Sequence, residues 1–347
     1  MSVLVQSINA KSFLDDSESS ILLDVRSPGE YSKGHIPGAV NLPLFSDKER
    51  AEVGTLYKQK NRDTAYEKGL EIVGPKMAGF VRKVKSLTNG SDLTVHCWRG
   101  GQRSQSMAWL LSNAGFKVRV IEGGYKAFRT LMLKTFEKTQ AQFLIIGGKT
   151  GIGKTELLHA LSQAGEQVID LEGMANHKGS AFGALGQATQ PTTEQFANDL
   201  FTLFQKMDIN RRIWLENESR TIGTVYLPDP FLDTMKSSIL INVDIPMNLR
   251  VQRLVNEYAT FPPESLIDAF ERIERRLGGQ NMKAAIQAIN AGEFHEAAAI
   301  ALRYYDKSYL HAVNRWPFKK IFEIQLEEDN PENGAKTIIE LANEQQL

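Results

Sequence analysis

Cysteine is almost missing from this sequence, since one residue of 347, Cys97, carries a thiol. A lone cysteine cannot close an internal disulfide or build a cysteine-rich metal site. Disulfide-stabilised secreted domains are therefore excluded. We expect a cytoplasmic protein, because a reducing compartment keeps a thiol free.

Long apolar runs and an excess of charge are also missing. No stretch approaches the ~20 apolar residues of a membrane span, and Met1–Gln6 lacks the basic and apolar parts of a signal peptide. We expect no membrane partner and favour a monomer. The chain has 41 basic and 41 acidic residues, which excludes a globally basic nucleic-acid binder but not a local basic face.

Basic residues gather in the last quarter of the chain. The groups are Arg272, Arg275 and Arg276; Arg303 and Lys307; and Arg315, Lys319 and Lys320. Such groups are either solvated helix faces or phosphate-facing surfaces, and the sequence alone leaves both open.

Short apolar runs alternate with helical patterns along most of the chain. The helical pattern at 104–114 is amphipathic, and residues 264–311 are helical throughout. The runs that predict buried strands are 21–25, 93–96, 118–121, 143–146, 167–170, 212–215 and 239–243. This alternation predicts α/β domains with parallel sheets and a helical C-terminal part. A polar segment at 134–142, either a linker or a helix end, separates the expected domains 1–135 and 142–347.

Cys97 opens the segment CWRGGQRS, where a predicted strand gives way to a helix. Gly100 and Gly101 allow backbone N–H groups to turn toward the sulfur, and Arg99 and Arg103 add positive charge. Together with the helix N-terminus, these features should lower the pKa of Cys97 and favour the thiolate. The same N–H groups would hold a persulfide or a phosphate-like anion. The alternative, a buried structural cysteine, is disfavoured by the flanking arginines and glycines.

A phosphate-binding loop of the Walker A type, GKTGIGKT, occupies residues 148–155 between an apolar run and a helical pattern. Lys154 would neutralise phosphate oxygens, and the Thr155 hydroxyl would ligate Mg²⁺. The glycines that let the backbone wrap a phosphate are Gly148, Gly151 and Gly153. We expect no permanently bound cofactor, with Mg²⁺ as the candidate ion. The strand–loop–helix context disfavours a chance glycine-rich turn.

Acidic residues stand at the ends of two predicted strands. Glu216 and Glu218 follow the run 212–215, the usual position of a Walker B acid, where they would hold Mg²⁺ directly or through water. Asp170 ends another predicted strand, and Glu172 lies just beyond it. The alternative is a set of solvated acids, which are common at the strand ends of α/β sheets.

Two other segments are candidates for the wall of a phosphate site. Residues 248–253 carry Arg250 and Arg253, which either reach phosphates or lie on a plain amphipathic helix. Residues 176–183 are polar and glycine-rich, too long for a tight turn, and are expected to line the site. His177 in this segment has no neighbouring ligand at metal-binding spacing.

The segments around Cys97 resemble the signatures of rhodanese domains over about residues 1–135. The matching segments are LDVRSPGEY at 23–31, GHIPGA at 34–39 and IEGGYKAF at 121–128. The resemblance implies that Cys97 carries sulfur or selenium as a persulfide or selenosulfide. Asp24, Arg26 and His35 in these signatures are expected to be scaffold residues.

A rhodanese-like domain followed by a P-loop domain, with WLENESR at 214–220, resembles the bacterial tRNA 2-selenouridine synthases over essentially the whole chain. The resemblance implies a transferase that converts 2-thiouridine to 2-selenouridine at the wobble position of tRNAs for Lys, Glu and Gln. It implies S-geranylation with geranyl diphosphate, then selenation with selenophosphate through an S-selanylcysteine at Cys97. A selenophosphate supplier is an implied partner, and Arg272, Arg275 and Arg276 are candidates for tRNA contact.

Because geranyl transfer releases diphosphate, the phosphate loop is expected to bind geranyl diphosphate rather than ATP. Two other functions remain open from the sequence. One is an ATP-dependent rhodanese-type sulfurtransferase, in which the loop activates an acceptor and Cys97 passes sulfur to it. The other is a regulatory module with a phosphate-binding switch and an inert rhodanese-like domain, which the intact Cys97 disfavours.

Overall fold

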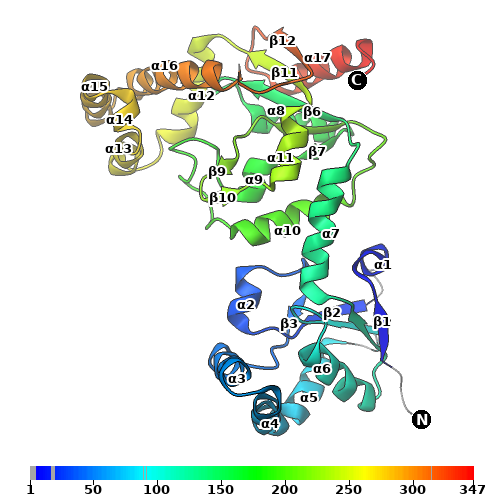
Figure 1. The fold of residues 1–347 in the computed structure, drawn as a ribbon. Coiled ribbons are helices and arrows are strands. Elements are labelled where there is room, and N and C mark those ends of the chain that lie inside the picture. Colours follow the sequence, from blue (N-terminus) through cyan, green and yellow to red (C-terminus); the bar gives the residue numbers. More distant parts are fainter. Residues whose placement is uncertain (1–4, 17–19, 89, 91, 314) are drawn as a thin grey trace. The chain divides into compact units, whose positions relative to one another are not determined.

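The computed structural model describes residues 5–16, 20–88, 90, 92–313 and 315–347 (Figure 1). The chain divides into two compact units, Met1–Thr135 and Phe136–Leu347. Helix α7 (Gly124–Lys138) contains this boundary. The polar segment at 134–142 is therefore a helix end for its first five residues, Lys134–Lys138, and a connection to the next strand for the rest.

A five-stranded parallel sheet in the order β1-β5-β4-β2-β3 forms the centre of the first unit. Its strands are β1 (Gln6–Ile8), β2 (Ser20–Asp24), β3 (Val40–Asn41), β4 (Asp92–His96) and β5 (Val118–Ile121). The three strands predicted in this unit are confirmed as β2, β4 and β5. Strand β4 lies between two neighbours, so the residue after it, Cys97, leaves the sheet at its centre.

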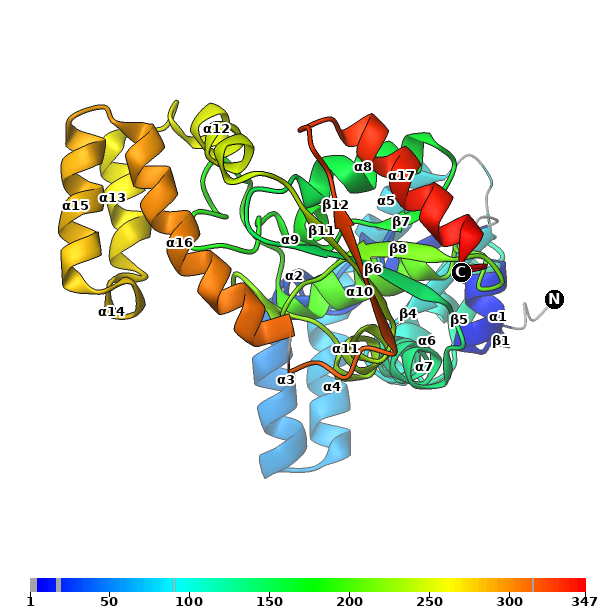
Figure 2. The ribbon, with the colours of Figure 1, turned by 90° about the horizontal axis from the view of Figure 1, so that it is seen from above.

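Helices cover this sheet and extend away from it. They are α1 (Ala10–Asp15), α2 (Pro28–Lys33), α3 (Asp47–Gln59), α4 (Arg62–Val73), the 3₁₀ turn η2 (Gly74–Lys76), α5 (Met77–Leu87) and α6 (Gln102–Asn113). Helix α6 packs on β4 and β5, with Met107 and Leu111 buried against Leu93 and Val95. Helices α3 and α4 lie side by side as a pair (Figures 1 and 2).

The second unit also contains a five-stranded parallel sheet, in the order β12-β11-β6-β8-β7. Its strands are β6 (Phe143–Gly148), β7 (Gln167–Ile169), β8 (Ile213–Glu216), β11 (Ile239–Asp244) and β12 (Lys320–Gln325). A small antiparallel pair, β9 (Thr221–Ile222) and β10 (Val225–Tyr226), stands apart from it. Strands β7 and β8 lie on one side of β6, and the later strands β11 and β12 lie on the other. Strand β6 is therefore at the topological switch point, where parallel sheets bind ligands.

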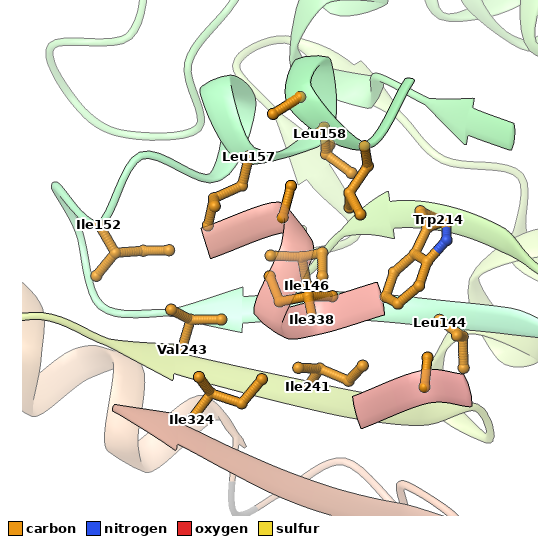
Figure 3. Packing of buried hydrophobic residues seen from close by; sticks show 14 of the residues in the cluster. Leu144, Ile146, Ile152, Leu157, Leu158, Trp214, Ile241, Val243, Ile324 and Ile338 are labelled. Carbon is orange, nitrogen blue, oxygen red and sulfur yellow. The ribbon is translucent and has the colours of Figure 1, made fainter. Parts of the chain in front are cut away.

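Alternate residues of β6 face two different layers. Leu144 and Ile146 pack between the sheet and helices α8 (Lys154–Gln163) and α17 (Pro331–Glu344), as Figure 3 shows. Phe143 points to the opposite layer, where its ring centroid lies 5.2 Å from that of Phe231. The other helices of this part are α9 (Leu171–Ala175), α10 (Thr193–Phe204), α11 (Asp229–Lys236) and α12 (Met247–Tyr258).

The predicted helical region forms a cluster with its own apolar core. Its helices are α13 (Pro263–Glu271), α14 (Glu274–Leu277), α15 (Gly279–Asn290) and α16 (Phe294–Val313). Gly278 lies between α14 and α15 and Gly292 between α15 and α16, and both have positive φ. The predicted fold class of two parallel α/β units with a helical part is confirmed, although the chain returns to the sheet as β12 after α16.

Among the described helices, none has the length and apolar character needed to cross a bilayer.

Candidate functional site

The Cys97 loop connects the end of β4 to α6 and lies directly against the start of α7. Gly100 has φ +66°, and a Cβ there would approach the carbonyl oxygen of Ile121 to 2.6 Å. Gly124 has φ +56°, and its Cβ would approach the carbonyl oxygen of Cys97 to 2.3 Å. Tyr125 N donates to the same oxygen at 2.9 Å. The two glycines therefore allow a close backbone approach that fixes the shape of the loop.

The Cys97 sulfur lies at the floor of this loop and is 4% exposed. Its Sγ is 3.2 Å from the hydroxyl oxygen of the buried Ser104. Helix α6 begins just beyond, and no side chain caps it at Gly101. The first N–H groups of α6 are therefore available to an anion attached to or bound beside the sulfur.

The two predicted arginines of this loop have different surroundings. Arg103 donates to the carboxylate of Glu30 at 2.6 and 3.3 Å. Burial alone would lower the pKa of Arg103, but the Glu30 and Cys97 charges hold it above its usual value. Arg99 is exposed and has no ion-pair partner in the described part of the chain. Arg103 is thus a fixed positive charge near the sulfur, and Arg99 is open to solvent.

A buried polar cluster packs beside the Cys97 loop and contacts Tyr125, which is hydrogen-bonded to the loop. The Arg26 guanidinium donates to Asp24 at 2.6 Å and to the Gly34 carbonyl at 2.7 Å, and it lies 3.9 Å from the centre of the Tyr125 ring. His96 Nε2 is 3.7 Å from the same Asp24 carboxylate. The third expected scaffold residue, His35, instead stacks on Tyr31 and contacts its carbonyl at 3.0 Å.

The phosphate loop follows β6 in the second unit. Gly148, Gly151 and Gly153 all have positive φ. A Cβ on Gly148 would approach the Val243 carbonyl oxygen to 2.5 Å, and one on Gly153 would approach the Arg253 guanidinium to 2.7 Å. These contacts explain the glycines of the motif by close packing as well as by backbone conformation.

Buried carboxyl groups surround Lys154 at the base of the loop. Burial alone would lower the pKa of Lys154, but Glu172, Glu218 and Glu216 hold it above its usual value. Burial, then the charges of Asp170 and Glu172, raise the pKa of Glu216 well above its ordinary range. Burial and the Glu172 carboxylate raise the pKa of Glu218 to about 8. The site therefore has more acidic groups than one lysine can balance.

The arrangement fits a Mg²⁺ ion that arrives with a phosphate. Among the described residues, no group of three or more His, Cys, Asp and Glu is placed to hold a metal alone. Thr155 Oγ1 lies 3.2 Å from Glu172 Oε2, and Glu216 Oε2 is buried with no described partner. Since Mg²⁺ takes one or two protein oxygens with phosphate oxygens and waters, Thr155 and Glu172 are suitable ligands.

Asp170, the third acidic candidate, has a local structural contact. Its carboxylate accepts from Gly173 N at 2.7 Å and so caps the start of α9. His159 Nε2 lies 3.4 Å from the same carboxylate. Asp170 therefore acts on the site mainly through its charge on Glu216.

A cavity of about 380 Å³ extends from the phosphate loop into the helical cluster. Lys154, Thr155, Glu172 and Glu218 line the loop end, together with Lys178 and Gly179 of the segment 176–183. The far end, which we call the apolar chamber, is lined by Leu266, Phe270, Ile289, Phe294, Ala297, Ala298 and Ala301. The site thus joins a phosphate-binding surface to an apolar one.

The sequence did not identify the apolar chamber. Its walls come from α13, α15 and α16, each more than a hundred residues after the phosphate loop in the sequence. The one local signal is the run Ala297–Ala299 after Phe294, because small residues on a helix leave space beside it.

The two arginines predicted near the phosphates have separate roles. Arg250 is buried, pairs with Asp306 at 2.7 Å, and donates to the carbonyl of Thr150 at 3.3 Å, which supports the loop from outside. Arg253 lines the cavity beside Gly153 and pairs with Glu156 at 3.0 Å. Arg253 is therefore the one that reaches the cavity.

Arg272, Arg275 and Arg276 lie away from the cavity wall. All three are exposed at the end of α13 and in α14. Their proposed contact with tRNA stays a prediction.

Models of two protein families match the chain. The model described as tRNA 2-selenouridine synthase AAA domain matches residues 141–328, and the rhodanese-like domain model matches residues 9–131. The chain is similar to proteins named tRNA 2-selenouridine synthase. That of Sulfurovum sp. (strain NBC37-1) is 34% identical over 342 residues, covering 88% of this chain and 92% of the relative. Those of Aeromonas salmonicida (strain A449) and Bordetella petrii are each 35% identical, covering 87% of this chain and 89% of the relative.

Proposed function

Since the chain belongs to the tRNA 2-selenouridine synthase family and is a transferase-type enzyme, we propose that it converts 2-thiouridine to 2-selenouridine in tRNA. The proposed targets are the wobble uridines of tRNAs for Lys, Glu and Gln, which implies action in the cytoplasm. The proposed co-substrates are geranyl diphosphate and selenophosphate, with a selenophosphate-producing enzyme as supplier.

The observation that carries this proposal is the continuity between the phosphate loop and the apolar chamber. A prenyl diphosphate has a charged head and a hydrocarbon tail, and one cavity offers a surface for each. The volume of about 380 Å³ falls within the roughly 300–1,000 Å³ of ligand pockets. A purine would leave its polar edge unpaired against Leu266, Phe270 and Ile289, which would cost binding energy.

In the first step, the sulfur on C2 of the uridine attacks C1 of the geranyl chain. The bond from C1 to oxygen breaks, diphosphate leaves with the bonding electrons, and the N3 proton of the base is released. Lys154 and the loop N–H groups stabilise the charge that develops on diphosphate. Mg²⁺, where bound through Thr155 and Glu172, would supply further neutralisation of that charge.

In the second step, selenium replaces the geranylthio group. A bond forms between C2 and selenium, the bond from C2 to sulfur breaks, and geranylthiol leaves. Selenophosphate and water end as phosphate, so the overall exchange involves no net oxidation or reduction. Cys97 carries the selenium as a selenosulfide in this proposal. A disulfide-class oxidant accepts the two electrons released when the sulfur–selenium bond forms from thiolate and selenide, and a dithiol returns two electrons when that bond is cleaved after selenium has bonded to C2. The order has a chemical reason, because alkylation makes the sulfur a better leaving group.

Nucleoside mass spectrometry tests the proposal. The full-length protein is incubated with 2-thiouridine-containing tRNA, with geranyl diphosphate alone and then with selenophosphate added. We expect S-geranyl-2-thiouridine in the first case and 2-selenouridine in the second. Neither product forming would overturn the proposal.

A nucleotide competition experiment addresses the ATP-dependent sulfurtransferase alternative. We expect geranyl diphosphate to displace diphosphate from the protein and ATP to compete weakly. Tight ATP binding that geranyl diphosphate does not affect, or nucleotide hydrolysis that depends on a thiolated acceptor, would favour the sulfurtransferase.

A further inference from the structure

The first unit contains a second cavity that none of the preceding chemistry uses. It has a volume of about 550 Å³ and lies between α3, α4 and the start of α6. Figure 2 shows α3 and α4 running side by side. We call this cavity the α3–α4 groove. Its floor is apolar, with Leu44, Phe45 and Ala65 buried beneath it.

The charges along the α3–α4 groove have one sign. Among the described residues that line it, four are basic and none is acidic; the basic ones are Arg50, Lys58, Arg62 and Arg103. Glu30 pairs with Arg103 at 2.6 Å and with Arg50 at 3.5 Å. Lys58 and Arg62 are exposed, and neither has an ion-pair partner in the described part of the chain. The groove therefore favours an anionic ligand.

Two aromatic rings stand in the wall of the same groove. Tyr57 is 61% exposed and Tyr66 is 48% exposed, and both line the cavity. Exposed aromatic rings next to basic side chains that are not paired with an acid are typical of surfaces that bind single-stranded nucleic acid. There the rings stack on bases and the basic side chains contact phosphates.

Two glycines keep the groove open at a cost to the helices that carry them. Gly54 in α3 and Gly69 in α4 line the cavity, and neither has a positive φ. A Cβ on Gly69 would meet only Phe45 Cζ, at 3.5 Å, which is an ordinary contact. Glycine disfavours a helix interior relative to alanine. Neither backbone conformation nor packing requires a glycine at position 69. We therefore infer that Gly69 serves to leave space in the groove.

The groove reaches the helix that follows the Cys97 loop. Gln102, Arg103 and Ser106 of α6 line its end, and Ser104 of the same helix is 3.2 Å from the Cys97 sulfur. Selenium on Cys97 must reach C2 of the wobble base. The neighbouring nucleotides must then lie close to the loop, where the groove begins.

We propose that the α3–α4 groove binds the anticodon-loop nucleotides that flank the wobble base of tRNA. Tyr57 and Tyr66 stack on bases, and Lys58 and Arg62 contact phosphates. This inference rests on the proposed function, because that function makes a wobble uridine the acceptor.

An RNA hairpin with the sequence of the anticodon arm and 2-thiouridine at the wobble position tests the inference. Its affinity for the full-length protein is measured by fluorescence anisotropy at each of several salt concentrations, and variants are compared at the same concentration. We expect Tyr57→Ala and Tyr66→Ala each to bind about fivefold to 150-fold more weakly, which corresponds to roughly 1–3 kcal/mol per stacked base. Lys58→Glu should weaken binding and reduce its dependence on salt.

Matched controls lie outside the groove. Trp109 is 59% exposed on α6 and Lys83 is exposed on α5, and neither lines the cavity. Trp109→Ala and Lys83→Glu should bind the hairpin as the wild type does. Equal losses in the controls would overturn the inference, since the effect would then not belong to the groove.

Gly69→Leu separates a binding role from a structural one. Leucine favours the helix over glycine, so we expect an unchanged or higher melting temperature together with weaker RNA binding. Wild-type affinity in Gly69→Leu and in both tyrosine variants would overturn the inference alone, provided that the wild-type protein binds and modifies the hairpin. A wild-type protein that neither binds nor modifies tRNA or the hairpin would overturn the proposed function as well.

Discussion

The Cys97 loop and the phosphate loop follow the same backbone plan in two different sheets. Each leaves the carboxyl end of a strand with neighbours on both sides, β4 or β6, and enters a helix, α6 or α8. Each turns through glycines with positive φ, and a Cβ on Gly100 or Gly148 would approach a carbonyl oxygen to 2.6 or 2.5 Å. The shared plan gives both loops N–H groups at a helix start that can bind an anion.

The charged groups around the two loops differ in sign. Beside Cys97, Arg99 is unpaired among the described residues and Arg103 is balanced by Glu30. Beneath the phosphate loop, three buried glutamates surround the half-buried Lys154. The first loop can hold an anion unaided, whereas the second needs a cation or protons with it. The similar path from strand through glycine turn to helix therefore leaves the chemistry to the side chains at neighbouring strand ends.

The largest expected effect is that of Cys97→Ala, which should remove the activity of the Cys97 loop and leave that of the phosphate loop. Cys97→Ala should abolish 2-selenouridine formation and leave geranylation intact, because the sulfur that carries selenium is gone while the phosphate site is untouched. S-geranyl-2-thiouridine should then accumulate in tRNA, as measured by nucleoside mass spectrometry. A variant that makes neither nucleoside would contradict this division of labour.

Lys154→Ala should reverse that pattern. Loss of one preorganised positive group at a developing charge lowers the rate by about 10²–10³-fold, so geranylation should fall by that factor. Selenation of tRNA that is already geranylated should continue. Lys149→Ala is the matched control, because Lys149 is engaged with Asp244 at 2.6 Å. Full geranylation by Lys154→Ala would mean that the loop serves another substrate.

Filling the apolar chamber should have a smaller effect on the same step. Ala298 of α16 lines the chamber, and its neighbour Ala299 does not. Ala298→Phe should raise the KM for geranyl diphosphate about tenfold, which corresponds to losing the free energy of burying roughly two methylene groups. Ala299→Phe should leave the KM unchanged. Binding of inorganic diphosphate, measured by calorimetry, should be unchanged in both. Weaker diphosphate binding in Ala298→Phe would indicate a distorted loop rather than a filled chamber.

Local signals explain why both loops were visible in the sequence. Strands β2, β4 and β5 appear as apolar runs because they are buried, and the glycine spacing of each loop records its close backbone contacts. The lone cysteine and the Walker A motif are contiguous segments. No long-range information was needed to place Cys97 and Lys154 at strand ends.

The parts that the sequence did not reveal depend on contacts between distant segments. Strands β1 and β3 have three and two residues, too few to show the alternation of apolar and polar residues that marks a strand. Glu172 follows β7 and Lys154 follows β6, so their proximity depends on the strand order β6-β8-β7 within the sheet. The apolar chamber requires α13, α15 and α16 to pack around a cavity. In each case pairing order and tertiary packing, which have no local signature, decide the result.

The smallest predicted effect is an opposite response of the two units to pH. Burial alone would raise the pKa of Asp24, but His96 and Arg26 outweigh it and hold that pKa below 3.8. Stability from this group is present above pH 3.8 and is lost as the pH falls. Glu218, whose pKa rises to about 8 through burial and Glu172, contributes stability that is present below its unfolded pKa of 4.5 and lost as the pH rises through 8.

Without divalent ions, the first unit should therefore weaken below about pH 4 and the second between about pH 5 and 8, each by a few kcal/mol at most. Peptide-resolved hydrogen exchange, corrected for its intrinsic pH dependence, measures the two units in one intact chain. Glu218→Gln should flatten the response of the second unit and leave the first unchanged, because a neutral amide cannot ionise beside Glu172. The same slope in Glu218→Gln and wild type would show that Glu218 is not the source of the difference between the units.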